Sequence, residues 1–226
     1  IGRHDCGFTG YDWMVEQEAN VVELLDLGFD PVRIVAAIPE EFKSIEELTK
    51  KLAGRPVVVA SEYEQLAKTF IKKFDLNAIF VHAYGATEAL PPEDADIIID
   101  NTASGTTLHH NRLIIVDELM QSTTRFICNR QSLEDPVKQL QLEELTMLMK
   151  STIQARTKVL LEMNVPTAVL EQVVNNLPCM MAPSISSLHD NQGYAVKAAV
   201  PTELIPALIP KLVALGARDI LEYKLQ

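Results

Sequence analysis

The sequence has few cysteines, no long apolar run and no excess of positive charge. Its 226 residues include 3 cysteines with no Cys-x-x-Cys spacing and no secretory leader ahead of them, which predicts a reducing, cytoplasmic location. The longest apolar stretches, such as 34–38 and 56–60, fall far short of the ~20 residues that a membrane-spanning helix needs. The net charge of -11 repels phosphate backbones, so neither a membrane nor a nucleic acid is an expected partner.

The acidic residues are concentrated in one part of the chain. Residues 1–150 hold 14 Lys and Arg against 25 Asp and Glu, whereas residues 151–226 hold 6 against 6. The hydrophobic content of 47% is ordinary for a globular protein, and 226 residues exceed the usual single domain of ~100 to 200 residues. We therefore expect two units with different surfaces, residues 1–150 and 151–226.

The first region alternates buried apolar runs with amphipathic segments. Four strands are predicted, at residues 32–38, 56–60, 78–83 and 96–99. Helices are predicted over residues 40–52 and about 61–74, the second opened by a capping box of Ser61 and Glu64. Continuous apolar strands that alternate with helices are typical of an α/β fold with parallel sheets covered on both faces.

The second region has a different order of elements. Asp135 as N-cap and Pro136 as first helical residue open a long helix at the boundary. The expected elements that follow are strand 158–165, helix 167–176, strands 183–188 and 194–200, helix 203–215 and strand 220–223. This β-α-β-β-α-β order predicts a ferredoxin-like domain.

The segment 95–108 carries the strongest signal for chemistry. A buried strand ends in Asp100, and a loop of small hydroxylated residues around Gly105 follows it. At the carboxyl end of a strand, such a loop can turn backbone N–H groups and hydroxyls toward a phosphate, with the carboxylate near ribose hydroxyls. An ordinary β-turn with good capping residues explains this stretch of sequence equally well.

Several separate blocks of sequence occur in the same order in a known family. They read DCGFTG at 5–10, LDLGFD at 25–30, GATEALP at 85–91, ADIIIDNTASGTTLHHNRL at 95–113, MNVP at 163–166, and Leu177-Pro178 through Pro183-Ser-Ile185. Together they resemble ATP phosphoribosyltransferase, the first enzyme of histidine biosynthesis, in its long form with a regulatory C-terminal domain. The resemblance runs the length of the chain.

The resemblance implies a fold and a reaction. The fold is a two-lobed α/β catalytic unit like a periplasmic binding protein, followed by the ferredoxin-like regulatory domain. The reaction transfers a phosphoribosyl group from phosphoribosyl pyrophosphate to N1 of ATP, which gives phosphoribosyl-ATP and pyrophosphate. Mg²⁺ is carried by the substrate rather than bound by the protein alone. The resemblance further implies that histidine is a feedback inhibitor and that the protein is a homo-oligomer, a hexamer.

The resemblance also implies roles for particular residues. Those expected to bind the 5′-phosphate are Ser104, Gly105, Thr106, Thr107 and Leu108. The catalytic carboxylates, which hold the ribose hydroxyls, are Glu88 and Asp100. Residues expected to contact the nucleotide or diphosphate are Asp5, Thr9 and Gly10. Asn164 and Ser184 match the histidine contacts, and because the family more often has an acidic residue and Thr there, we expect weaker inhibition.

Two departures from the family pattern leave a second hypothesis open. The family begins with a further strand and a cationic loop, so we expect a segment to be missing ahead of Ile1 and the chain as given to be inactive or nearly so. His109 and His110 replace the family's basic residue after GTTL. The alternative function is a non-catalytic small-molecule-binding or regulatory protein that retains the cleft and the effector domain.

Overall fold

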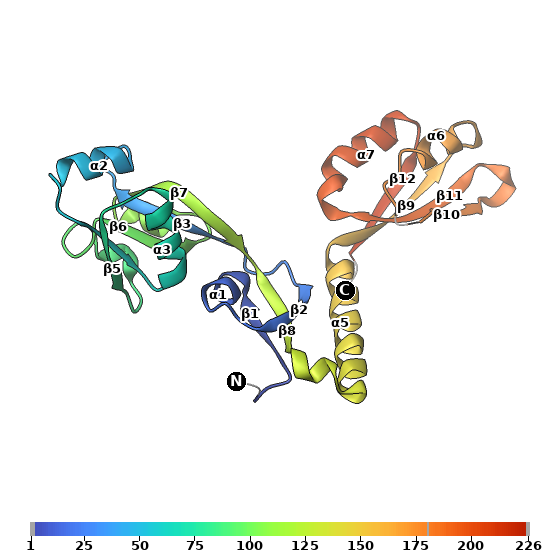
Figure 1. The fold of residues 1–226 in the computed structure, drawn as a ribbon. Coiled ribbons are helices and arrows are strands. Elements are labelled where there is room, and N and C mark those ends of the chain that lie inside the picture. Colours follow the sequence, from blue (N-terminus) through green and yellow to red (C-terminus); the bar gives the residue numbers. More distant parts are fainter. Residues whose placement is uncertain (1–2, 180, 225–226) are drawn as a thin grey trace. The chain divides into compact units, whose positions relative to one another are not determined.

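The structure is a computed structural model that describes residues 3–179 and 181–224. The chain divides into two compact units, one up to Thr146 and one from Met147 onward (Figure 1). No helix in the described ranges is long and apolar enough to cross a membrane. The first unit contains two sheets and the second contains one.

The larger sheet of the first unit is mixed rather than parallel. Its strands are β3 (Val32–Pro39), β4 (Val57–Ser61), β5 (Ala78–His82), β6 (Ile97–Thr102) and β7 (Leu113–Ser122), in the order β5-β4-β6-β3-β7. β4 is parallel to β5 and β6, as predicted, but β3 is antiparallel to both of its neighbours. The prediction was wrong for β3 because this strand enters from the other sheet, at the end where β6 finishes.

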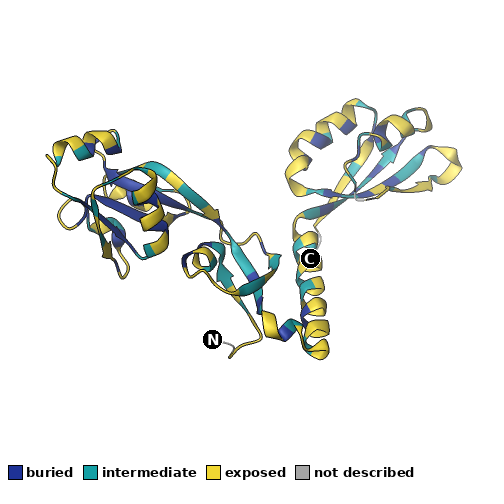
Figure 2. Ribbon diagram, viewed as in Figure 1, coloured by how far each residue is buried: buried dark blue, intermediate teal, exposed yellow. Residues whose placement is uncertain are grey.

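The core of this sheet is covered on both faces. Ile34, Ile38, Ile97 and Ile99 are fully buried on one face against helices α2 (Ile45–Lys51) and α3 (Glu64–Lys73). The other face packs on the short helix α4 (Thr106–His110). The dark strands at the centre of this sheet in Figure 2 show the same burial. The apolar runs that became β3, β4 and β6 therefore do mark strands buried on two sides, whereas Ile79 and Val81 of the edge strand β5 are exposed.

Two predicted helix starts are corrected by the caps that the structure shows. Helix α2 begins after Ser44, whose Oγ accepts the N–H of Glu47 at 3.3 Å, so residues 40–43 lie outside it. Helix α3 is not opened by a capping box of Ser61. The Ser61 Oγ instead accepts the N–H of Tyr63 and donates to the carbonyl of Ile99, so it ties β4 to β6.

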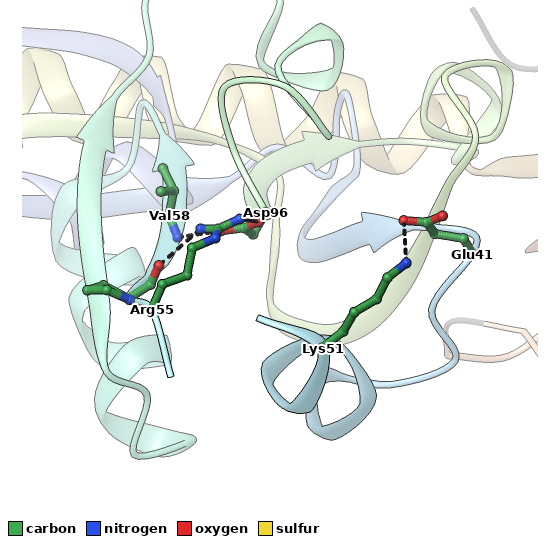
Figure 3. Close-up of polar contacts among 6 residues, drawn as sticks. Glu41, Lys51, Arg55, Val58 and Asp96 are labelled. Atoms are coloured by element: carbon green, nitrogen blue, oxygen red, sulfur yellow. Dashed lines mark hydrogen bonds and ion pairs between the residues drawn. The ribbon is translucent and has the colours of Figure 1, made fainter. Parts of the chain in front are cut away.

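An ion pair between the half-exposed Arg55 and the buried Asp96 fixes the start of β6 against β4 (Figure 3). The guanidinium of Arg55 donates to both carboxylate oxygens of Asp96, at 2.8 and 2.7 Å, and the N–H of Val58 donates to the same carboxylate at 2.8 Å. Bidentate pairs of this kind combine strength with geometric precision. The strand that carries Asp100 is thereby held in register at its first residues.

The smaller sheet of the first unit consists of strands that the sequence analysis did not predict. They are β1 (Cys6–Gly10), β8 (Thr124–Asn129) and β2 (Val21–Asp26), antiparallel in the order β1-β8-β2, and helix α1 (Tyr11–Glu16) follows β1. The chain passes between the sheets twice, from β2 to β3 and from β7 to β8 (Figure 1). Two sheets joined in this way form a two-lobed α/β unit, which confirms the predicted fold class.

The second unit has the predicted ferredoxin-like topology. Strands β9 (Lys158–Val165), β10 (Ser184–Ser187), β11 (Tyr194–Pro201) and β12 (Arg218–Lys224) form an antiparallel sheet in the order β10-β11-β9-β12. Helices α6 (Leu170–Val174) and α7 (Ile205–Ala214) contribute Val173 and Leu212 to the core on one face. Helix α5 (Pro136–Arg156) begins as predicted, because the Asp135 carboxylate accepts the N–H groups of Val137 and Lys138.

Candidate active site

The hydroxyl-rich loop lies directly after β6 and is closed by its own polar groups. The N–H of Gly105 donates to Thr102 Oγ1 at 2.9 Å, and the hydroxyls of Ser104 and Thr106 are 2.8 Å apart. Gly105 has φ of +80°, a left-handed conformation that favours glycine. Leu108 is buried beneath the loop, while Ser104, Thr106 and Thr107 are exposed. An anion could therefore replace the internal hydrogen bonds without disturbing the core.

The two predicted catalytic carboxylates, Asp100 and Glu88, lie close enough to interact. Asp100 is half-buried on β6, and burial raises its pKa to about 6, with further increases from the nearby charges of Glu88 and Glu62. Glu88 is half-buried in the turn Thr87–Ala89. Glu62, which follows the carboxyl end of β4, was not predicted as a site residue. Three acidic groups around one point favour a ligand that carries or develops positive charge.

A buried polar network joins helix α1 to the larger sheet next to this site. Asp12 of α1 is 5% exposed and its carboxylate accepts hydrogen bonds from the hydroxyls of Tyr63, at 2.7 Å, and Ser122. Asn101, the neighbour of Asp100, donates to the Tyr63 oxygen at 3.3 Å. Burial, followed by the hydrogen bond to Asp12, raises the pKa of Tyr63 well above its ordinary value. The network connects α1 to β6 through side chains alone.

A second carboxylate of α1 caps a helix of the larger sheet. Glu16 is 5% exposed and accepts the N–H groups of Gln65, at 3.0 Å, and Leu66, at 3.1 Å, in the first turn of α3. It therefore has the role that the sequence analysis gave to Ser61. A cap supplied from 50 positions away leaves no local sequence signal, which is why Glu16 was missed. Asp12 was missed for a similar reason, because its partners Tyr63 and Ser122 lie 51 and 110 positions away.

The residues predicted to contact the nucleotide or diphosphate separate into two places. Thr9 and Gly10 end β1, and a side chain at Gly10 would collide with the carboxylate of Asp12, so this position abuts the buried network. Asp5 lies before the other end of β1, where Ser132 donates to it at 2.8 Å and Lys138 at 2.6 Å. The structure therefore brings Thr9 and Gly10 to the network but does not bring Asp5 there.

The two residues predicted to contact histidine lie on the open face of the second unit's sheet. Asn164 on β9 pairs with Ala195 on β11, and Ser184 on β10 pairs with Lys197 on β11. From the strand spacings their Cα atoms are about 12 Å apart. The amide of Asn164 donates to the carboxylate of Asp219 at 2.8 Å. An acidic group, which the pair of Asn164 and Ser184 itself lacks, therefore lies beside Asn164.

A two-lobed α/β unit that combines a hydroxyl-rich loop with clustered carboxylates is suited to binding a phosphorylated sugar. Comparison with known proteins identifies the family to which the chain belongs. Residues 1–151 match the family model HisG, ATP phosphoribosyltransferase, and residues 155–226 match HisG, C-terminal domain. The chain belongs to the ATP phosphoribosyltransferase family, and its activity is the first step of histidine biosynthesis. The predicted transferase function is confirmed and is preferred over the non-catalytic alternative.

Individual relatives agree with this assignment. The chain is 39% identical to the ATP phosphoribosyltransferase of Chlorobium chlorochromatii over 100% of this chain and 77% of that protein. It is 37% identical to that of Thermodesulfovibrio yellowstonii over 99% of this chain and 77% of that protein. The ATP phosphoribosyl transferase (HisG:HisZ) complex from Thermotoga maritima has a similar fold, with a TM-score of 0.59, 22% identity, and coverage of 68% of this chain and 72% of that one.

Proposed function

We propose that the site formed by the loop Ser104–Leu108, Asp100 and Glu88 binds phosphoribosyl pyrophosphate, with the loop on the 5′-phosphate and the carboxylates at the ribose hydroxyls. The observation that carries this assignment is the position of the half-buried Asp100. It lies near Glu88 and two residues before Thr102, whose hydroxyl accepts the N–H of Gly105 in the loop. Thr9 and Gly10 approach the nucleotide or diphosphate from the other lobe. Asp5, bonded to Ser132 and Lys138, orders the end of β1 instead.

The charge arrangement suits the chemistry of this transfer. Adenine N1 of ATP attacks the anomeric carbon as the bond to the diphosphate breaks, so positive charge develops on the ribose ring. The carboxylates of Asp100 and Glu88 favour that charge. Neutral adenine needs no general base, and orientation of the two substrates supplies much of the rate enhancement. Mg²⁺, held by the substrate's diphosphate, would supply charge neutralisation on the leaving group, and carboxylate oxygens are its preferred protein ligands.

Replacing Asp100 by Asn tests the assignment through stability and ligand binding together. The folded Asp100 holds its proton up to about pH 6, above the value of 3.8 for a free side chain. The wild-type protein therefore loses stability as the pH rises from about 4 through 6, whereas Asn does not titrate. We expect Asp100→Asn to be more stable by about 1 to 3 kcal/mol at pH 8, with the difference vanishing below pH 4.

The same variant should bind its ligand less well despite its greater stability. Functional groups are often retained although they destabilise the fold, and the half-buried carboxylate of Asp100 fits this description. The measurement is urea unfolding at both pH values, followed by the thermal shift that phosphoribosyl pyrophosphate induces. Asp94→Asn, at an exposed carboxylate, is the matched control and should change neither quantity. A full ligand-induced shift in Asp100→Asn would contradict the proposed role.

We further propose that the second unit binds histidine and that binding inhibits the transferase. Asn164 and Asp219 together offer an amide and a carboxylate, which suit the carboxylate and ammonium of an amino acid. Ser184, on the same open face, is within reach only of an extended ligand. The coupling to the catalytic site would be reciprocal and of order 1 to 3 kcal/mol. The hexameric state and the cytoplasmic location stay predictions.

Substitution of the carboxylate in this pair should weaken histidine binding. Asp219→Asn removes the charge that would meet the ammonium, and loss of one charge-assisted hydrogen bond corresponds to about ten- to hundredfold weaker binding. Asn164→Ala and Ser184→Ala should also reduce it. The measurement is thermal shift against histidine concentration. Glu203→Gln, at an exposed residue of the same unit, is the control. Equal shifts in all variants would place the pocket elsewhere.

A further inference from the structure

The first sheet brings two of the three cysteines directly opposite each other. Cys6 on β1 pairs in register with Cys128 on β8, although they are 122 positions apart in the sequence. All three cysteines are free thiols in the structure. In an antiparallel sheet, directly opposite side chains project from the same face. The two thiols are therefore neighbours on one face of the sheet.

The hydrogen bonds of this ladder show which kind of pair the cysteines form. The N–H of Asn129 donates to the carbonyl of Asp5 at 2.9 Å, and the N–H of Tyr11 donates to the carbonyl of Thr123 at 3.1 Å. Hydrogen-bonded and non-hydrogen-bonded pairs alternate along the ladder, so the pair formed by Cys6 and Cys128 is non-hydrogen-bonded.

That geometry suits a disulfide. The Cα atoms of a non-hydrogen-bonded pair are about 4.5 Å apart, and disulfides span Cα separations of about 4.4 to 6.8 Å. The next pair of the same kind, Phe8 and Phe126, brings its rings to 5.3 Å between centroids, which shows that side chains on this face do meet. The register therefore places the two cysteines at the short end of the range of separations that a disulfide spans.

Access to the two thiols is unequal, which gives them different roles. Cys6 is exposed and Cys128 is 1% exposed. Both line an open pocket of about 980 Å³ on this sheet, so a peptide-sized oxidant can reach Cys6 from solvent. Burial raises the pKa of the Cys128 thiol, with a smaller contribution from Cys6, so Cys128 is the poorer first nucleophile.

We propose that Cys6 and Cys128 are an oxidation site that closes reversibly to an intramolecular disulfide, with glutathione disulfide or another small disulfide as oxidant. The Cys6 thiolate attacks one sulfur of the oxidant, which forms a mixed disulfide and releases one glutathione thiol. The Cys128 thiolate then attacks the Cys6 sulfur and releases the second glutathione. Two protein thiols lose two protons and two electrons, and one glutathione disulfide is reduced to two thiols.

The bond would stabilise the first unit. It would close a loop that contains both passages of the chain between the two sheets, and a disulfide across so long a loop removes much of the entropy of the unfolded chain. We expect the melting temperature to rise by about 5 to 10 °C on oxidation. The bond would also fix β1 to β8 beside Asp5, the residue held by Ser132 and Lys138.

The test uses the full chain with Cys179→Ser, which removes the third thiol and leaves the pair. After incubation with glutathione disulfide, unfolding and blocking with N-ethylmaleimide, intact mass should show a monomer that carries neither glutathione nor maleimide. Cys128→Ala in the same background should stop at a single mixed disulfide on Cys6. Cys6→Ser should leave Cys128 reduced.

A comparison of folded and unfolded protein separates proximity in the fold from general thiol reactivity. In glutathione buffers the equilibrium constant for disulfide formation should be at least about tenfold larger for the folded chain than for the same chain in urea. The reason is that a disulfide which stabilises the folded state forms more readily in that state. A persistent mixed disulfide on Cys6 with Cys128 free, a disulfide-linked dimer, or equal oxidation in urea would each overturn the proposal.

Discussion

Replacing Thr106 or Thr107 by Ala is expected to weaken binding of phosphoribosyl pyrophosphate by about ten- to a hundredfold for each hydroxyl removed. The hydroxyls of Thr106 and Ser104 are hydrogen-bonded to each other at 2.8 Å. A phosphate that enters the loop would accept the hydrogen bond of the Thr106 hydroxyl in place of this contact. Hydrogen bonds to a charged phosphate are worth about 1.5 to 3 kcal/mol each. The loss in the double variant need not equal the sum, because adjacent residues on one ligand couple. Isothermal titration calorimetry with the purified chain measures the affinity directly.

The fold should be unaffected by these substitutions, which makes the result interpretable. Thr106 and Thr107 are exposed, and surface changes of this kind shift stability by no more than about 0.5 kcal/mol. The matched controls are Thr106→Ser and Thr107→Ser, which keep the hydroxyl and should retain most of the affinity. Unchanged affinity in the alanine variants would mean that the loop is the plain β-turn that the sequence also allowed.

Much of the fold could be predicted from the sequence, because the central strands of the larger sheet are buried on both faces. The apolar runs that became β3, β4 and β6 lie inside a sheet covered by helices, whereas β5 is an edge strand on which Ile79 and Val81 are exposed. The ferredoxin-like unit followed from element order alone. Strands β1 and β2 combine exposed and half-buried residues, and β8 buries only Phe126 and Cys128, so none of them carries a comparable apolar run.

The residues of the candidate site likewise fall into those that the sequence could predict and those that it could not. The loop and Asp100 are contiguous in the sequence, so the order of a strand, a carboxylate and hydroxylated residues was enough to predict this part of the site. The fold alone brings three further acidic residues close to their partners, namely Glu62, Asp12 and Asp219. No residue next to them in the sequence indicates these contacts. Periodicity and local motifs report on burial and capping nearby in the chain. They do not report which distant side chains meet.

Truncation of Asp12 to Ala is expected to be the most destabilising of these changes. The carboxylate accepts hydrogen bonds from Tyr63, which is 1% exposed, and from Ser122, which is 3% exposed, so its loss leaves two buried hydroxyls without their acceptor. Two hydrogen bonds to a buried carboxylate correspond to about 3 to 5 kcal/mol of unfolding free energy. The exposed Asp94→Ala is the control for removing a negative charge.

The protein carries its own probe for this experiment. It has 1 tryptophan. Trp13 lies beside Asp12, and its ring packs on that of Tyr63 with centroids 4.8 Å apart. Tryptophan fluorescence during urea unfolding therefore reports on the first unit and not on the second, which avoids a two-state treatment of the whole chain. A midpoint shift in fluorescence without one in the second unit would place the loss where the structure predicts it.

A double-mutant cycle then decides whether the network acts as a unit. Asp12→Asn keeps the shape and one acceptor oxygen, and Tyr63→Phe removes the hydroxyl that lies between Asp12 and Asn101. Residues that share one buried network show coupling of about 0.5 to 3 kcal/mol, whereas independent contributions add. We expect coupling, and we expect both single variants to weaken binding of phosphoribosyl pyrophosphate, because the network ends on the neighbour of Asp100. Additive stabilities with unchanged ligand affinity would show that Asp12 only holds α1 against the larger sheet and does not position the site.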